Sequence, residues 1–304
     1  MMSIIPRFGI KQRIGCIQLK PFSLRWYSED LNVSTIIVAS IQDPAGLKVK
    51  EKLLKKYRFK EIELVFDDAP VYRMDNVLLA TSSKHTIYSD HVEGFFNPYV
   101  VIFVSKHKSE SGVPALLVHT PGNWSSNASF GGRPGSLCNA FASAVEEALL
   151  ELKTQKAKLG LNGWRCGLEV THHGPYFEKA AALFIELGGT EKEWLNDEAA
   201  EAVAAAAVKA ASATRDTYRV ASGFGGGHYA PRFSDFALRG EYAFAHIIPK
   251  YAFREGLTRE LIVQSIRRST EEVRYALVDR GLRSEDKKLV LNALTDTGVN
   301  IIEV

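Results

Sequence analysis

The sequence predicts a single α/β domain in which a mostly parallel or mixed sheet is flanked by helices. From Ser34 onward, apolar runs of strand length recur, and most are apolar throughout rather than alternating, which is typical of strands covered on both faces. Segments with helical periodicity lie between several of these runs, and this alternation favours an α/β architecture. No linker rich in Pro, Ser or Gly divides residues 31–304, so we treat them as one domain.

The expected strands come first. The strand-length runs lie at residues 35–41, 61–66, 76–81, 100–105, 115–120, 166–171, 182–187, 219–224 and 244–248, with a final strand in "VNIIEV" at 299–304.

Helices are expected between these strands. Asp43 is a plausible N-cap, with Pro44 as the first helical residue. Residues 134–158 repeat apolar side chains with a helical period, and the alanine-rich residues 196–213 carry acidic residues in their first turn. Thr258 and Ser284 are each expected to cap a helix near the C-terminus.

Composition restricts the class of protein. The chain has 304 residues, of which 46% are hydrophobic and 24% charged, as in ordinary globular proteins. No apolar run approaches the roughly 20 residues that span a bilayer, so no membrane association is expected. Cys16, Cys138 and Cys166 are odd in number and far apart, which argues against a disulfide framework and fits a reducing compartment.

The N-terminus differs from the rest of the chain. Residues 1–27 hold five basic and no acidic residues mixed with apolar ones, a composition typical of a mitochondrial or other organellar transit peptide. "RWYS" looks like a processing site with cleavage after Tyr27; the alternative is a basic tail on a cytoplasmic protein. The net charge of the whole chain is +3 and that of the remainder is −2, so nucleic-acid binding would require a local basic patch.

Polar residues follow several apolar runs at the expected strand ends, where ligands bind in open α/β sheets. These residues are His119, His172, His173, Glu186, His228, Tyr229, His246 and Lys250.

The paired histidines need a turn to act together. Adjacent side chains of a strand point to opposite faces, so His172 and His173 can face one reacting atom only if the chain turns at the following Gly-Pro. Glu186 is either a rim carboxylate or a partly buried base that orients a histidine. His85, His91 and His107 lie in polar sequence and are interpreted as surface residues.

The stretch "GFGGGHYAPR" at residues 223–232 is a candidate binding loop. It lacks the spacing of a dinucleotide fingerprint or a P-loop, and the chain has no GxSxG elbow. Glycines let a ligand reach backbone N–H groups, so the amides of Gly225, Gly226 and Gly227 are candidates to stabilise an ester oxyanion. No HExxH spacing occurs, so the residues alone leave a metal site open.

One basic segment could contact RNA. Residues 48–60, "KVKEKLLKKYRFK", hold seven Lys or Arg and one Glu. The segment is either a solvated helix face or a phosphate-binding patch, which Arg133, Arg232, Lys250 and Arg254 could extend.

Taken together, "THHGP" at 171–175, "GFGGGHYAPR" at 223–232 and "HIIPKYA" at 246–252 resemble the archaeal and plant type of D-aminoacyl-tRNA deacylase. "ALLVHTPGN" at 115–123, "FGGRP" at 130–134 and "FIELGGTEKEW" at 184–194 support the resemblance, in the family's order. It implies an α/β fold similar to phosphorylases and peptidyl-tRNA hydrolase. It also implies hydrolysis of the ester between a D-amino acid and the 3′-terminal ribose of tRNA, and a zinc ion.

On this resemblance we expect His172 or His173, helped by Glu186, to activate a water, with Gly225, Gly226 and Gly227 as oxyanion donors. Substrate contacts are expected from His119, His228, Tyr229, Arg232, His246 and Lys250, and zinc ligands from His172, His173 and His228. The expected partner is the 3′ end of aminoacylated tRNA, and the protein is expected to be a monomer. The alternatives are a nucleoside phosphorylase-like enzyme, a zinc-dependent amidohydrolase and a non-catalytic RNA-binding module.

Overall fold

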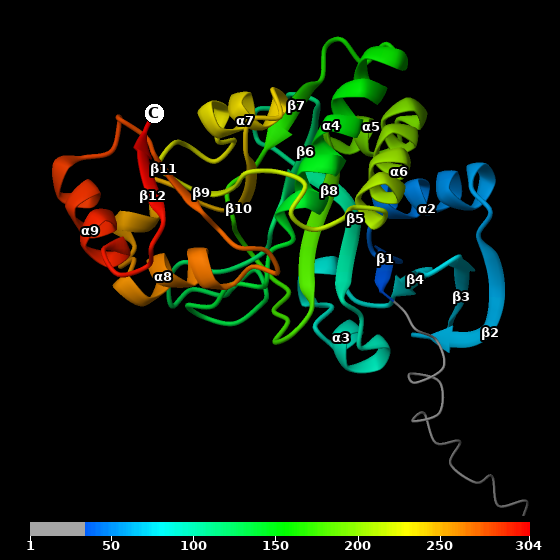
Figure 1. Ribbon diagram of the computed structural model, residues 1–304. Coiled ribbons are helices and arrows are strands. Elements are labelled where there is room, and N and C mark those ends of the chain that lie inside the picture. The colour runs from blue at the N-terminus through cyan, green and yellow to red at the C-terminus, as the bar shows by residue number, and fades with distance from the viewer. Residues whose placement is uncertain (1–33) are drawn as a thin grey trace, which may run out of the picture. The chain divides into compact units, whose positions relative to one another are not determined.

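The computed structural model describes residues 34–304, and its larger sheet has eight strands (Figure 1). Their order is β2-β3-β4-β1-β5-β8-β6-β7. The strands are β1 (Thr35–Ser40), β2 (Lys60–Phe66), β3 (Ala69–Met74), β4 (Val77–Ser82), β5 (Val100–Lys108), β6 (Ala115–His119), β7 (Arg165–Leu168) and β8 (Ala181–Gly189). Strands β4, β1, β5 and β8 run parallel, whereas β6 runs antiparallel to β8, so the sheet is mixed as predicted.

A second sheet forms from the C-terminal third of the chain. It has four parallel strands in the order β10-β9-β11-β12. These are β9 (Val220–Phe224), β10 (Ala243–Ile248), β11 (Tyr275–Val278) and β12 (Asn300–Glu303). Helices α7 (Pro231–Leu238), α8 (Arg259–Arg267) and α9 (Ser284–Leu294) accompany this sheet (Figure 1). The sequence predicted the α/β class but not this division into two sheets.

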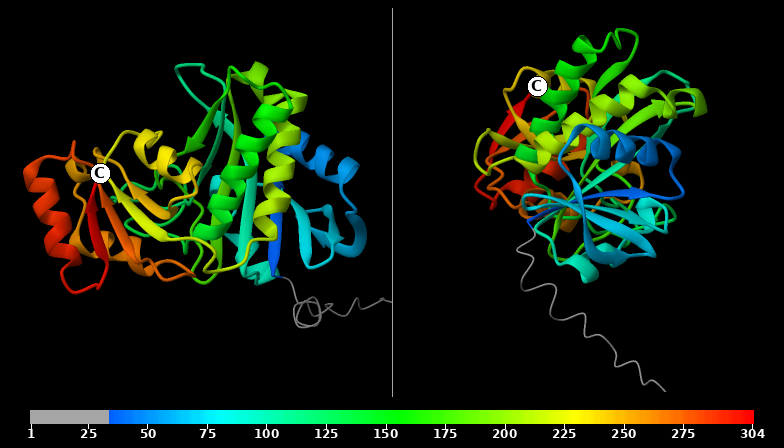
Figure 2. Two further views of the ribbon diagram at one scale, coloured as in Figure 1. Left: turned by 45° about the horizontal axis from the view of Figure 1, so that its top comes forward. Right: turned by 90° about the vertical axis from the view of Figure 1, so that its right-hand side faces the viewer.

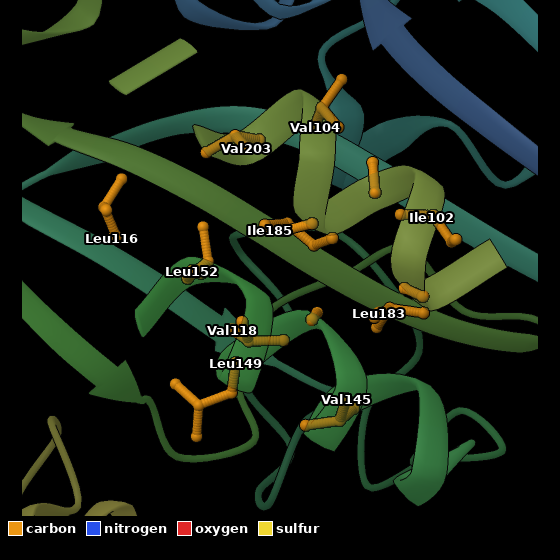
Figure 3. Packing of buried hydrophobic residues seen from close by; sticks show 14 of the residues in the cluster. Ile102, Val104, Leu116, Val118, Val145, Leu149, Leu152, Leu183, Ile185 and Val203 are labelled. Atoms are coloured by element: carbon orange, nitrogen blue, oxygen red, sulfur yellow. The ribbon is translucent and has the colours of Figure 1, made fainter. Parts of the chain in front are cut away.

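Three helices cover one face of the larger sheet: α2 (Pro44–Lys56), α4 (Ala142–Lys158) and α6 (Asp197–Ala211). Helices α4 and α6 lie side by side across the strands (Figure 2). Leu149 of α4 and Val203 of α6 pack against β-strand residues such as Ile102, Leu183 and Ile185, all fully buried (Figure 3). The alanines of α6 allow this close approach, and their burial stabilises the layer.

The opposite face of the larger sheet carries different residues. Because side chains alternate along a strand, Ile102 and Val104 face the helices, whereas Phe103, Ser105 and His107 face the other way. Strand β8 alternates in the same manner, with Ile185 towards the helices and Glu186 paired in register with Ser105. The side of the sheet opposite α2, α4 and α6 therefore becomes polar towards the ends of β5 and β8.

The expected helix ends are mostly confirmed. Asp43 caps α2 by accepting a hydrogen bond from the Gly46 amide (2.9 Å), and Thr258 caps α8. Ser284 is the first residue of α9, one position after its N-cap. The helix expected over 134–158 begins only at Ala142, because residues 134–141 form a loop that pairs with neighbouring segments.

Shorter elements complete the fold. These are α3 (His91–Phe96), α5 (Glu191–Trp194) and the 3-10 helices η2 (Thr86–Tyr88) and η3 (Ala252–Arg254). Strands β3 and β11 were not predicted. Across residues 34–304, no helix combines the length and apolarity needed to cross a bilayer. The predicted transit peptide lies outside the described residues.

Candidate active site

A cavity of about 680 Å³ opens at the polar ends of the larger sheet. Its walls come from Asp43 after β1, from the end of β5, from the loop Gly122–Phe130, and from His172, His173 and His228 in the loops after β7 and β9. Its volume lies in the usual range for small-molecule sites. Segments far apart in the chain therefore bring several histidines and carboxylates together around one cavity.

Four histidine rings gather at this cavity. The ring centroids of His119 and His172 are 4.2 Å apart, those of His172 and His173 are 4.3 Å apart, and His228 lies 4.7 Å from His172. His119 is almost fully buried behind the pair, and both of its ring nitrogens lack a hydrogen-bond partner. Such a buried polar group normally has a partner, which is an argument for a bound water or ion beside it.

A backbone turn brings His172 and His173 to the same side. His173 adopts a left-handed conformation (φ 46°), which side chains rarely adopt outside functional sites and turns. Its Nδ1 contacts the Gly174 carbonyl at 2.7 Å, and the Nδ1 of His172 contacts the Val170 carbonyl at 2.8 Å. Because a carbonyl only accepts, each Nδ1 carries the proton of a neutral ring, and each Nε2 keeps a free lone pair.

Two buried carboxylates lie beside the histidines. Glu169 Oε1 is 2.9 Å from His228 Nε2, and Glu186 accepts a hydrogen bond from Ser105 (2.9 Å). His107 lies between them, with Nδ1 3.5 Å from Glu169 and 3.4 Å from Glu186. The site thus alternates carboxylates and imidazoles within contact distance.

The electrostatic environment separates the histidines into two kinds. Burial, together with the nearby charges of the other histidines, lowers the pKa of His172 well below its usual value and that of His173 to about 3. Burial also disfavours charge on His107, but Glu186 and Glu169 outweigh it and raise the pKa of His107. For Glu186, burial is likewise outweighed by His107 and His119, so its pKa is well below the usual value. At neutral pH, His172 and His173 are therefore neutral bases beside an ionised Glu186.

Close glycine contacts hold the histidine turn in place. A Cβ on Gly174 would lie 2.2 Å from the Gly132 nitrogen and 2.5 Å from the Ile87 carbonyl. Gly132 itself has φ 79°, and a Cβ there would lie 3.0 Å from Gly174 Cα. The motifs "FGGRP" and "THHGP" therefore interlock through their glycines, because no side chain fits between them.

The structure places three predicted glycines away from the cavity wall. The Gly225 amide already donates to the Ile248 carbonyl (2.8 Å), and a Cβ there would meet Asp279. Gly226 packs near the same aspartate, and Gly227 lines a separate hollow beside α7. This placement corrects the expectation that Gly225, Gly226 and Gly227 face the ester, because none of the three lines the cavity and the Gly225 amide is already bonded to β10.

Several other predicted residues also lie outside the cavity. His246 is buried, its Nε2 donates to the Arg268 carbonyl (2.8 Å) and its Nδ1 accepts from Thr171 (3.3 Å), so both nitrogens are used structurally. Arg232 is exposed on α7, and the Lys250 amine lies near Gly281. These bonds correct His246 to a structural residue, whereas substrate contacts of Arg232 and Lys250, which lie outside the cavity, stay a prediction.

Tyr229 supports the site from behind. Its hydroxyl donates to Ser109 (2.9 Å) and accepts from His107 Nε2 (3.2 Å), while the Arg165 guanidinium lies 4.3 Å above its ring. Tyr229 is therefore a positioning residue for His107 and does not line the cavity, in contrast to the expected substrate contact.

Two residues that lie among the histidines and carboxylates of the site were not predicted from the sequence. His107, taken as a surface residue, is buried in the site because β5 continues to Lys108. Glu169 lies directly after β7 in the run "GLEVT". The signal was present for Glu169, an ionisable residue in an otherwise apolar run, but not for His107, which stands between Lys106 and Lys108.

The basic segment at residues 48–60 is partly neutralised by acidic residues of α6. Lys48 and Lys52 of α2 form ion pairs with Asp197 of α6 (2.6 and 2.9 Å), and Lys56 pairs with Glu201. These contacts favour a helix face that contacts α6 for three of the seven basic residues, and a phosphate-binding role for the remainder of the segment stays a prediction.

Comparisons with known proteins agree on one family. The family model for D-aminoacyl-tRNA deacylase matches residues 95–302. A D-aminoacyl-tRNA deacylase of Pyrococcus furiosus is 36% identical over 88% of this chain and 99% of the relative, and that of Archaeoglobus fulgidus is 33% identical over 88% and 95%.

One solved structure supports the fold. The crystal structure of a conserved protein of unknown function matches with a TM-score of 0.81 and 32% identity, over 89% of this chain and 95% of that one. The phosphorylase-like and amidohydrolase alternatives are not favoured by these relatives, and the family predicted from the motifs is confirmed: this chain belongs to the D-aminoacyl-tRNA deacylase family.

Proposed function

We propose that this protein hydrolyses the ester bond of D-aminoacyl-tRNA at the histidine cavity, releasing a free D-amino acid and tRNA. The observation that carries the proposal is the pair of neutral imidazoles, His172 and His173, whose Nε2 lone pairs remain free in a cavity bordered by Glu169 and Glu186. An aminoacyl ester is already activated, so a positioned water and a nearby base suffice.

The reaction assigns a role to each group. A water oxygen attacks the ester carbonyl carbon while Nε2 of His173 or His172 accepts its proton. The bond to the ribose oxygen then breaks, and the imidazolium returns that proton to the leaving oxygen. Glu186 and Glu169 stabilise positive charge on the histidines during these steps, which is the usual role of a carboxylate beside a catalytic imidazole.

The residues also fit the zinc ion that the family resemblance implies. Ligand atoms of Glu169, His172 and His228 lie within 4.8 Å of one another, and those of His119, His172 and His173 form an overlapping group. The unpartnered nitrogens of His119 and the Oε2 atom of Glu169 are atoms that a cation would satisfy. A bound zinc would supply polarisation of a coordinated water. The expected set of His172, His173 and His228 thus divides between two groups that share His172.

Matched D- and L-aminoacyl-tRNA test the proposed activity. Purified protein should deacylate the D-ester much faster than the L-ester. Equal rates, or no hydrolysis of either, would overturn the proposal. The same assay after chelation and zinc repletion tests the metal: an unchanged rate in protein shown to be free of zinc would remove zinc from the reaction.

We further propose that residues 1–27 direct the protein to mitochondria or another organelle, on the composition given above. A fluorescent protein fused to residues 1–33 should enter the organelle, and the fusion without them should not.

A further inference from the structure

The mouth of the cavity carries an aromatic side chain that the proposed chemistry does not use. Phe130 lines the cavity, yet 68% of its side chain is exposed, the largest exposure of any large hydrophobic residue within residues 34–304. Tyr251 lines the same cavity and is also exposed. Single exposed apolar residues are ordinary, but an aromatic ring at the entrance of a reactive cavity has a flat face available to a ligand.

The backbone around Phe130 is held firmly although its ring is not covered. The Phe130 carbonyl accepts a hydrogen bond from the Gly174 amide (3.0 Å), and the Tyr88 hydroxyl donates to the Ser129 carbonyl (3.0 Å). Gly131, which follows, has φ 80°, and a Cβ there would meet the Ile87 carbonyl at 1.9 Å. The ring is therefore presented from a fixed turn, which lowers the entropy lost when a ligand binds.

The same contacts tie Phe130 to the turn that carries His172 and His173. Gly174, which bonds to Phe130, directly follows His173 in the chain. In an aminoacyl-tRNA, the ester is carried by the ribose of the terminal nucleotide, so the terminal base is bonded to the sugar that enters beside the histidines. The terminal base would then lie at the cavity mouth, where the exposed ring of Phe130 offers a flat face on which the base can stack.

We propose that Phe130 is the stacking platform for the terminal base of the tRNA acceptor strand, an inference that rests on the proposed function. Stacking of a base on an aromatic ring depends little on base identity, because every base has a π face. The contact is made equally in the ground state and the transition state, so it should affect KM rather than kcat.

The test compares Phe130→Ala, Phe130→Trp and a control, Val65→Ala. Val65 is 62% exposed on β2, at the far edge of the larger sheet from the cavity residues. We expect Phe130→Ala to raise KM for D-aminoacyl-tRNA about 5- to 150-fold, the ratio expected for one base–aromatic stack. Phe130→Trp should keep KM near that of the unaltered protein, as should Val65→Ala, with kcat similar throughout.

A substrate change separates stacking from a general effect on the loop. A D-aminoacylated RNA minihelix whose terminal nucleotide lacks its base should raise KM for the unaltered protein as much as Phe130→Ala does. The variant should then show no further loss on that substrate. Full additivity of the two losses, or an unchanged KM for Phe130→Ala, would overturn the inference. Failure of the unaltered protein to hydrolyse any D-aminoacyl ester would instead overturn the proposed function.

Discussion

The contact between Tyr229 and His107 predicts the effect of removing one oxygen atom. Tyr229→Phe keeps the aromatic ring and its contact with the Arg165 guanidinium, but it removes the acceptor that lies 3.2 Å from His107 Nε2. A hydrogen bond to a charged group contributes about 1.5–3 kcal/mol. Because water can reach the half-buried hydroxyl position, we take the lower end. His107 holds Glu169 and Glu186 beside the reacting histidines, so losing this support in the transition state corresponds to about a tenfold lower kcat.

Steady-state deacylation of D-aminoacyl-tRNA provides the measurement. Since Tyr229 does not line the cavity, KM should stay within about twofold while kcat falls. Tyr242→Phe is the matched control, because its ring packs against Phe236 and Tyr275 beside the second sheet. A rise in KM without a fall in kcat would show that Tyr229 binds substrate directly, and an unchanged kcat would refute its positioning role.

Three further substitutions distinguish catalytic from structural residues. His173→Ala should lower kcat at least about 100-fold with the melting temperature nearly unchanged, and normal turnover would remove His173 from the reaction. His246→Ala should do the reverse: calorimetry should show a lower melting temperature, whereas the folded fraction should keep its activity, because both ring nitrogens bond within the domain. Glu146→Gln addresses pH. Burial, then Glu147, raises the pKa of Glu146 from 4.5 to about 9. The folded state therefore holds a proton that the unfolded state loses above pH 4.5, and stability falls as pH rises towards about 9. The variant should lack this decline and gain up to about 3 kcal/mol at pH 7, and parallel slopes of denaturation midpoint against pH would contradict the assignment.

The sequence predicted the strands of the larger sheet because their apolar runs are long and bounded by polar turns. It missed β3, which pairs antiparallel near the sheet edge and contains Pro70, and β11, which has only four residues. Both are short or mixed in pattern, and their strand conformation depends on neighbours that local sequence does not identify.

Prediction of the site succeeded where a residue's own strand determined its position. Glu186 follows from its place in β8, and the turn at "THHGP" was expected from Gly-Pro. The errors concern loops whose direction depends on partners: the amide of Gly225 turns to Ile248, and His246 turns to Arg268. A glycine-rich sequence indicates that the backbone adopts an unusual conformation or approaches another group closely. It does not show which group that is.

Residues 169–173 also join the two sheets, which explains why residues from both contribute to the cavity. After β7, the Val170 amide donates to the His228 carbonyl (2.9 Å), and the Thr171 amide donates to the Ile247 carbonyl of β10 (3.0 Å). The two residues just before His172 are thus bonded to the second sheet and its loop, whereas Glu169, one residue earlier, contacts His107 of the larger sheet. Because the distance between His172 and His228 is set by these bonds, the second sheet acts as part of the site's scaffold although none of its strands lines the cavity. A change that displaces the backbone carbonyl of Ile247 should therefore alter turnover without contact to substrate, whereas His246→Ala leaves this backbone bond in place.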